Sequence, residues 1–191
     1  MKIKQRPSPN CDERTLPISL LILHYTGMEN GPAALERMTD AAAKVCAHYM
    51  VEENGDIFQL ADEDKRAWHA GVSSWRGETN INSNSIGIEI VNGGHDYGLP
   101  EFPDAQIKAV TTLSQDIMAR RNIAAKNVLG HSDIAPARKQ DPGEKFPWRK
   151  LAQNGVGLWP DTIEPDRRVL FETGARDRGV AAAQTGLAHI G

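Results

Sequence analysis

The chain has 191 residues, of which 40% are hydrophobic and 25% are charged, and its formal net charge is −3. This length and composition suit one globular domain of ordinary size that folds without disulfides, which excludes a globally disordered chain. The slightly acidic balance argues against nucleic acid as a partner held by a strongly basic surface. The two cysteines, Cys11 and Cys46, can form one bridge or, more simply, stay free thiols.

The apolar runs are too short for a transmembrane helix or for a signal peptide. None approaches the ~20 residues of a transmembrane helix. The run at 18–23 is shorter than the apolar core of a signal peptide, which takes about 7–15 residues. We therefore predict no membrane span and, because this sequence carries no export signal, a cytoplasmic protein. A periplasmic location stays open if a leader is missing from it.

The first third of the chain is predicted to form a lead-in, a strand, a helix and a hairpin. Residues 1–16 are polar and are expected to be irregular. Residues 18–25 are apolar on both faces, which is the pattern of a central strand. A helix is expected over 31–40, where Pro32 suits the first turn. Two strands within 45–60 should pair as a hairpin around the Asn54-Gly55 turn.

Two further strands and a long helix are expected in the rest of the main domain. Isoleucines alternate along 85–91, so one face of this strand is apolar. Apolar residues recur at helical spacing over 104–121. A short strand is expected at 126–130. The remaining segments are predicted as loops at 61–84, 92–102 and 132–147, with a short helix at Trp148.

This order of elements predicts an α/β fold in which a mixed central β-sheet is flanked by α-helices. The main domain is expected over 17–155. Residues 156–191 form a C-terminal extension, which is expected to carry a helix from Val180 onward.

His24 and His131 each follow a predicted strand. If the two strands are parallel neighbours, both imidazoles meet at the edge of the sheet where open α/β sheets bind ligands. Asp141 follows ten residues after His131. Two histidines and one carboxylate form a known catalytic zinc set. Two alternatives remain: histidines that simply bond nearby backbone, and a mononuclear iron site.

Glu89 is a second candidate, because the isoleucines of its strand occupy the opposite face. A carboxylate on a central strand is costly to bury unless it has a partner or a chemical role. It is either a general base near the metal or half of a structural ion pair. Lys139 lies two residues before Asp141. It either shares the site or is a solvated surface lysine.

Several aromatic and basic residues can contact a substrate. Tyr25 follows His24 at the strand exit. His69 begins a polar loop that also holds Trp75 and a neighbouring arginine, and such a loop suits a sugar or a peptide carboxylate. The alternative is a packing tryptophan with a surface arginine. His48 and its neighbour fall on opposite faces of a strand, so only one of them can face the site.

Five stretches together resemble a known family. The segment GHSDIAPARKQDPG covers 130–143, and LILHYTG, AHYMV, AWHAGVSSWRG and NSIGIEIVN precede it in the same order as in that family. They resemble the zinc-dependent N-acetylmuramoyl-L-alanine amidases of the AmpD and AmiD type. The SSWRG loop and the FPW that follows the last segment are closer to the AmiD type. The resemblance covers about residues 17–152.

The resemblance implies a zinc groove along one edge of the sheet and one Zn²⁺ per chain, held by His24, His131 and Asp141. It implies that Glu89 is the catalytic glutamate and Lys139 the assisting lysine. The candidates for substrate binding are Tyr25, His48, His69, Trp75 and Arg138.

The substrate that the resemblance implies is peptidoglycan or a muropeptide. The bond broken would be the amide between N-acetylmuramic acid, intact or 1,6-anhydro, and L-alanine of the stem peptide. No obligate protein partner is implied. The alternative is a peptidoglycan-binding module without catalysis. The C-terminal extension resembles the start of a small helical cell-wall-binding domain.

Overall fold

The computed structural model describes residues 2–160, 171, 174–176 and 178–190. The chain divides into two compact units, Met1–Trp159 and Pro160–Gly191. The first contains every strand found among the described residues. The second contains helix α6 (Arg178–Ile190), so a helix does form where the sequence predicts one. Residue 191, at the end of that predicted helix, lies outside the described residues.

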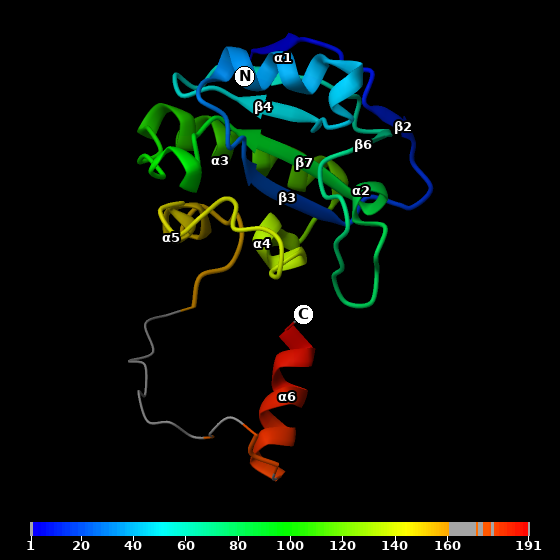
Figure 1. The fold of residues 1–191 in the computed structure, drawn as a ribbon, viewed down its shortest axis with the longest axis vertical. Helices are drawn as coiled ribbons and strands as arrows, with labels where there is room; N and C mark the ends of the chain where they lie inside the picture. The colour runs from blue at the N-terminus through cyan, green and yellow to red at the C-terminus, as the bar shows by residue number, and fades with distance from the viewer. Residues whose placement is uncertain (1, 161–170, 172–173, 177, 191) are drawn as a thin grey trace. The chain divides into compact units, whose positions relative to one another are not determined.

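A six-stranded mixed sheet forms the centre of the first unit (Figure 1). Four of its strands are mutually parallel, and the two remaining strands, both on one side of these four, run antiparallel to them. In spatial order the strands are β1 (Ile3–Gln5), β5 (Ile57–Gln59), β4 (Tyr49–Val51), β7 (Ser85–Ile90), β3 (Leu20–Tyr25) and β8 (Val128–Gly130). The longest strands, β3 and β7, lie side by side in the interior, as their apolar sequences predict. The predicted fold class is confirmed.

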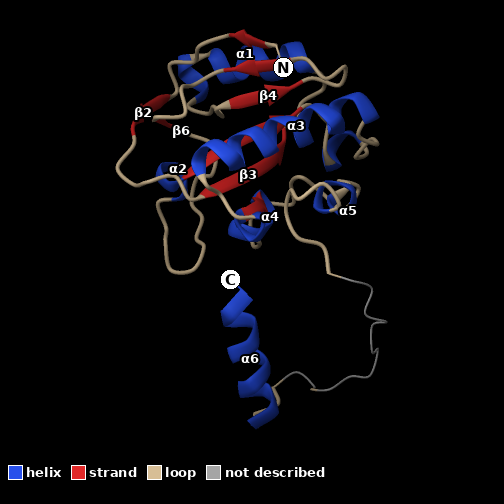
Figure 2. Cartoon of the chain, turned by 180° about the vertical axis from the view of Figure 1, so that it is seen from behind, coloured by secondary structure: helices blue, strands red, loops and turns tan. Residues whose placement is uncertain are grey.

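One face of the sheet is covered by α3 (Asp104–Arg121), which lies across the strands in Figure 2. The helix buries the apolar stripe predicted from its periodicity. The core on this side consists of helix residues Ile107, Val110, Leu113 and Ile117 against Leu21, Leu23, Ile86, Ile88 and Ile90 of the strands.

The opposite face is covered in two separate parts. Helix α1 (Gly31–Thr39) packs Ala34 and Met38 against Met50 of β4. Short helices α2 (Ile81–Asn84) and α4 (His131–Ile134) cover Leu20 and Ile22 of β3. Tyr25 and Glu89, near the carboxyl ends of β3 and β7, line a cavity. The remaining helices are α5 (Trp148–Ala152) and the 3-10 turns η1 (Ala41–Ala43), η2 (His95–Tyr97) and η3 (Ala125–Asn127).

Three segments that were expected to be irregular contain strands or α-helices. The lead-in forms β1, which pairs with β5, and β2 (Cys11–Glu13), which pairs antiparallel with β6 (Lys65–Ala67). The expected loop at 61–84 contains β6 and α2, and the expected loop at 132–147 begins inside α4. These pieces are three or four residues long. They carry too little periodicity to be recognised locally and form through contacts with distant segments.

Cys11 and Cys46 are both free thiols. Within the described part of the chain, helices long and apolar enough to cross a membrane are absent.

Candidate metal centre and active site

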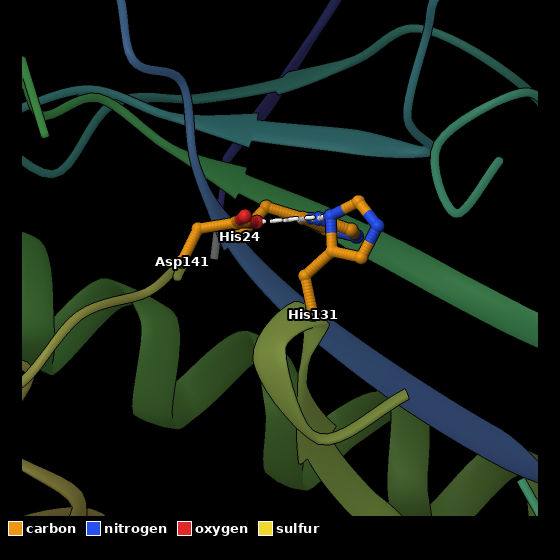
Figure 3. Close-up of side chains that lie close together, drawn as sticks. All are labelled: His24, His131 and Asp141. Atoms are coloured by element: carbon orange, nitrogen blue, oxygen red, sulfur yellow. Dashed lines mark hydrogen bonds and ion pairs between the residues drawn. The ribbon is translucent and has the colours of Figure 1, made fainter. Parts of the chain in front are cut away.

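Three side chains from distant parts of the chain meet at the carboxyl edge of the sheet (Figure 3). Nδ1 of His24 lies 2.9 Å from Nδ1 of His131, and each nitrogen lies 3.0 Å from Oδ2 of Asp141. All three residues are buried. The cluster therefore presents three metal-ligating atoms toward one another.

The fold explains why these residues meet. β3 and β8 are parallel neighbours, with Leu23 paired to Gly130, so the residues that follow both lie at the same edge. The loop that carries Asp141 is tied back to α4, because the amide of Ser132 donates to the Asp141 carbonyl. Gly130 permits this approach, since a Cβ there would lie 2.8 Å from Cδ of Pro142. The predicted meeting of the two histidines follows from the parallel pairing.

Hydrogen bonding assigns the proton on His131. Its Nε2 lies 2.9 Å from the carbonyl oxygen of Ala70, which can only accept, so Nε2 donates. In the neutral ring Nδ1 then carries a lone pair, and this lone pair faces the carboxylate of Asp141. Two acceptors face each other at 3.0 Å only when a positive charge, a proton or a cation, lies between them.

The donor set fits a divalent cation. Burial, together with the neighbouring His131, lowers the pKa of His24 to about 4, which disfavours a proton as the positive charge at neutral pH. Ligand atoms of a tetrahedral zinc site, about 2.0–2.1 Å from the ion, lie about 3.3 Å apart. The observed separations of 2.9–3.0 Å are close to this value. Histidine nitrogen and carboxylate oxygen are also ligand types that zinc accepts.

Glu89 lies beside this cluster on β7, in register with His24 on β3. Its Oε2 is buried and has no hydrogen-bond partner among the described residues. Burial and the charge of Asp141 raise the pKa of Glu89 well above its ordinary value, and Lys139 opposes this effect. A carboxylate in this environment binds a proton more strongly than an exposed one does.

A cavity of about 500 Å³ opens over the cluster. Its walls combine titratable, cationic and aromatic side chains, which suits a polar substrate that carries carboxylates. The lining includes most of the residues predicted from sequence, namely Tyr25, His69, Glu89, His131, Arg138, Lys139 and Asp141.

Arg138 and Tyr25 occupy defined positions in the cavity wall. Nη2 of Arg138 donates to the carbonyls of Ala70 and Val72 at 2.8 and 2.7 Å, which holds this loop against the site. The hydroxyl of Tyr25 lies 2.9 Å from Nδ1 of His95. Nε2 of His95 in turn lies 3.0 Å from Glu144, so the ring of Tyr25 is held at the mouth of the cavity.

His48 and Trp75, two of the side chains expected to contact substrate, are not among the residues that line this cavity. His48 is fully buried. Its Nδ1 accepts from the amide of Gly87 at 3.0 Å, and its Nε2 faces the carbonyl of Lys65 at 3.0 Å. Trp75 packs against the core cluster that contains Leu20 and Ile22. Both side chains hold structure together beneath or beside the site.

His69 is also buried, and hydrogen bonds to protein atoms engage both of its ring nitrogens. The cavity residues that sequence reasoning missed include two with side chains able to bind a polar ligand, Arg37 of α1 and His95 of η2. Arg37 lies on the exposed side of an ordinary amphipathic helix and gives no local signal. His95 stands in a glycine-rich loop directly after the strand of Glu89, a position that in principle could have identified it.

The fold and the cluster together define an α/β protein with a two-histidine, one-carboxylate candidate metal site at the carboxyl edge of a mixed sheet. The Amidase_2 family, described as N-acetylmuramoyl-L-alanine amidase, matches residues 14–144. The chain belongs to this family.

Three relatives illustrate the similarity. The chain is 46% identical over 157 residues to the N-acetylmuramoyl-L-alanine amidase AmiD of Escherichia coli, which covers 75% of this chain and 55% of the relative. The structure of E. coli AmiD with anhydro-N-acetylmuramic acid-L-Ala-D-gamma-Glu-L-Lys has a TM-score of 0.69 and 43% identity, covering 81% of this chain and 61% of the other. AmpDh3 of Pseudomonas aeruginosa with anhydromuramic pentapeptide has a TM-score of 0.73 and 36% identity, covering 90% and 73%. The chain spans about half the length of the first curated relatives that it matches.

Proposed function

We propose that this protein is a zinc-dependent amidase that hydrolyses the amide bond between N-acetylmuramic acid, intact or 1,6-anhydro, and L-alanine of the peptidoglycan stem peptide. The observation that carries the proposal is the set of three ligand atoms within 3.0 Å of one another beside Glu89 in a large polar cavity. Membership of the Amidase_2 family supports the bond type. We assign the activity to residues 17–155. The strands of the N-terminal lead-in pair with strands of this domain and so belong to its fold.

His24, His131 and Asp141 would hold one zinc ion, and three protein ligands leave a fourth position open. Zinc, when bound, activates water and polarises a carbonyl group at neutral pH. Neutral imidazoles are the form that ligates a metal, and the low pKa of His24 keeps its ring neutral.

Glu89 would move the proton. Its carboxylate takes a proton from the attacking water and delivers it to the alanine nitrogen, which then leaves as an amine. Burial and the charge of Asp141 raise the pKa of Glu89, so its carboxylate holds a proton more strongly than an exposed one does, which favours taking the proton from water.

Lys139 would stabilise the negative charge that develops on the former carbonyl oxygen. It lines the cavity together with Glu89 and Asp141. An ammonium group fixed in a partly desolvated site stabilises such an oxyanion more strongly than it would in water.

The cavity also suits the rest of the substrate. Stem peptides carry carboxylates, and Arg37, Arg138 and Lys139 bring positive charge to the cavity wall. Tyr25 offers an aromatic face to a sugar at the mouth. Two related proteins have been crystallised with anhydromuramyl peptides, which supports a ligand of this class.

The test is direct hydrolysis. The purified chain is incubated with anhydro-muropeptide, with intact muropeptide and with cell-wall sacculi, and products are separated by chromatography and mass spectrometry. We expect release of peptides that begin with L-alanine, loss of activity on chelation, and recovery with Zn²⁺. Muropeptide binding without turnover would identify a binding module instead. Zinc binding without cleavage of any muropeptide would indicate a hydrolase for another amide.

A further inference from the structure

A chain of hydrogen bonds runs from the candidate metal centre into the protein through His69. Nε2 of His24 lies 3.0 Å from Nδ1 of His69, and Nε2 of His69 lies 3.2 Å from Oγ of Ser85. The hydroxyl of Ser85 donates to the carbonyl of Ile81. His69 and Ser85 are both buried, so water does not compete for these bonds.

The hydrogen bond between Ser85 and Ile81 determines which atom donates in each of the other hydrogen bonds of this series. Ser85 has one hydroxyl proton and gives it to the carbonyl of Ile81, so toward His69 its oxygen can only accept. Nε2 of His69 therefore donates, and Nδ1 of the same neutral ring carries a lone pair. That lone pair accepts from Nε2 of His24. Nδ1 of His24 is left with its lone pair directed at the other two ligand atoms.

Ala70, the residue after His69, fixes the proton of His131 in the same way. The carbonyl of Ala70 accepts from Nε2 of His131 and so keeps the lone pair of that ring on Nδ1. The amides of His69 and Ala70 both donate to Oδ1 of Asn82, at 3.0 and 2.7 Å. One dipeptide, anchored by the side chain of Asn82, therefore faces both histidines of the cluster.

Packing holds the ring of His69 in this orientation. A Cβ at position 87 would lie 2.6 Å from Cγ and Nδ1 of His69, so the ring occupies space that only a glycine leaves free. Oγ of Ser85 and the ring of His69 thus lie along one face of β7. The ring has neither a free polar atom nor free space for a second role.

We propose that the dipeptide His69–Ala70, held by Ser85 and Asn82, positions the metal site by fixing the proton of His24 and of His131 on Nε2. This inference rests on the proposed function, because it assumes that the three ligand atoms hold a metal. A proton on Nδ1 of either ring would occupy the place of the metal–nitrogen bond. Ser85 and His69 are positioning residues: they act through His24 and do not touch the substrate.

The first test measures affinity for Zn²⁺ by competition with a chromogenic chelator. Methionine and glutamine have similar shapes, but the amide oxygen of glutamine is a strong acceptor for a hydrogen bond from His24, whereas the thioether of methionine is a weak one. We expect His69→Met to bind Zn²⁺ about 10–100-fold more weakly than wild type, as is usual when a partner of a ligating histidine is removed. His69→Gln should recover most of this loss. Equally weak binding by both variants would contradict a role for the acceptor.

Ser85→Ala tests the inner end of the chain, and Ser114→Ala is its matched control. Both serines are fully buried, but the hydroxyl of Ser114 has no hydrogen-bond partner among the described residues and belongs to α3. We expect Ser85→Ala to lower zinc affinity by about 10-fold and Ser114→Ala to leave it unchanged. Equal affinities in the two variants would overturn the proposal.

The second test reads the tautomers directly in metal-free protein. Nitrogen-15 NMR of histidine side chains at pH 8 distinguishes a proton on Nε2 from one on Nδ1. We expect His24 and His131 to be protonated on Nε2 in wild type, and His24 to become a mixture of tautomers in Ser85→Ala. A proton on Nδ1 of His24 in the wild type would disprove the assignment. This reading needs no activity, so it stands apart from any failure of the amidase assay.

Discussion

Glu89 lies directly opposite His24 in the parallel pairing of β7 with β3, and the next pair on the same face of the sheet is Gly87 opposite Ile22. Side chains alternate between the two faces of a strand, so one register places both the carboxyl group of Glu89 and Gly87 on the face that carries His24. A shift of this register by one residue would move Glu89 to the face covered by α3.

Glu89→Gln should abolish most of the turnover and leave the metal site intact. Glutamine keeps the shape of the side chain but cannot accept and return a proton. We expect kcat for muropeptide hydrolysis to fall by about 10²–10⁴-fold, with zinc content unchanged as measured by elemental analysis. Turnover near the wild-type rate would remove Glu89 from its proposed role.

Lys139→Met should slow hydrolysis because the transition state is stabilised less. Methionine keeps much of the length of the side chain and removes its charge, so the developing oxyanion loses one stabilising group. We expect kcat to fall by about 10²–10³-fold with a smaller change in KM. A change in KM alone would show that Lys139 binds substrate but does not stabilise the transition state.

The buried carboxylate of Glu63 should make stability depend on pH. Burial raises its pKa, but hydrogen bonds from Arg120, Arg121 and Tyr49 outweigh this effect and bring the pKa down to about 2, from an ordinary value of 4.5. Because the folded-state pKa is depressed, the stabilisation is complete above pH 4.5 and is lost as the pH falls toward 2.

Urea unfolding of wild type and Glu63→Gln measures this contribution. At pH 7 we expect the variant to be less stable by about 2 kcal/mol, because a charged acceptor of several hydrogen bonds is lost. The difference should shrink as the pH falls from 4.5 to 2. A difference that stays constant over this range would show that the charge of Glu63 contributes nothing.

Gly87→Ala should displace the ring of His69 and so weaken the proposed metal site. The added methyl group would overlap the ring of His69, and overpacking of a buried site typically costs about 1–3 kcal/mol. We expect both lower stability and weaker zinc binding. Gly77→Ala is the control, because its φ of +85° strains any L-residue although no atom lies within 4 Å of the added Cβ. It should cost stability alone, and equal zinc affinities in the two variants would contradict the role of Gly87.

Local sequence patterns predict much of the fold. The alternation in β7 and the helical spacing in α3 predict elements whose observed limits, Ser85–Ile90 and Asp104–Arg121, are within one residue of those expected. Apolar residues on both faces of β3 place that strand in the interior of the sheet. Because residues that follow parallel neighbouring strands meet at one edge, the approach of His24 to His131 was also predictable.

The short strands of the lead-in were not predictable, because β1 and β2 exist only by pairing with β5 and β6, more than fifty positions further along the chain. The burial of His48 and His69 was equally unpredictable from the sequence. A histidine on a strand or in a loop has the same local sequence whether it faces a cavity or lies buried beneath it.

The sequence by itself therefore determined the main strands of the sheet, the long helix and the chemistry available at the strand ends, because burial patterns and residue types are local properties. Only the tertiary structure decided which imidazole nitrogens face one another and which groups hold their protons. Those partners, Ser85, Ala70 and Asn82, are ordinary residues that acquire their role through contacts between segments far apart in the chain.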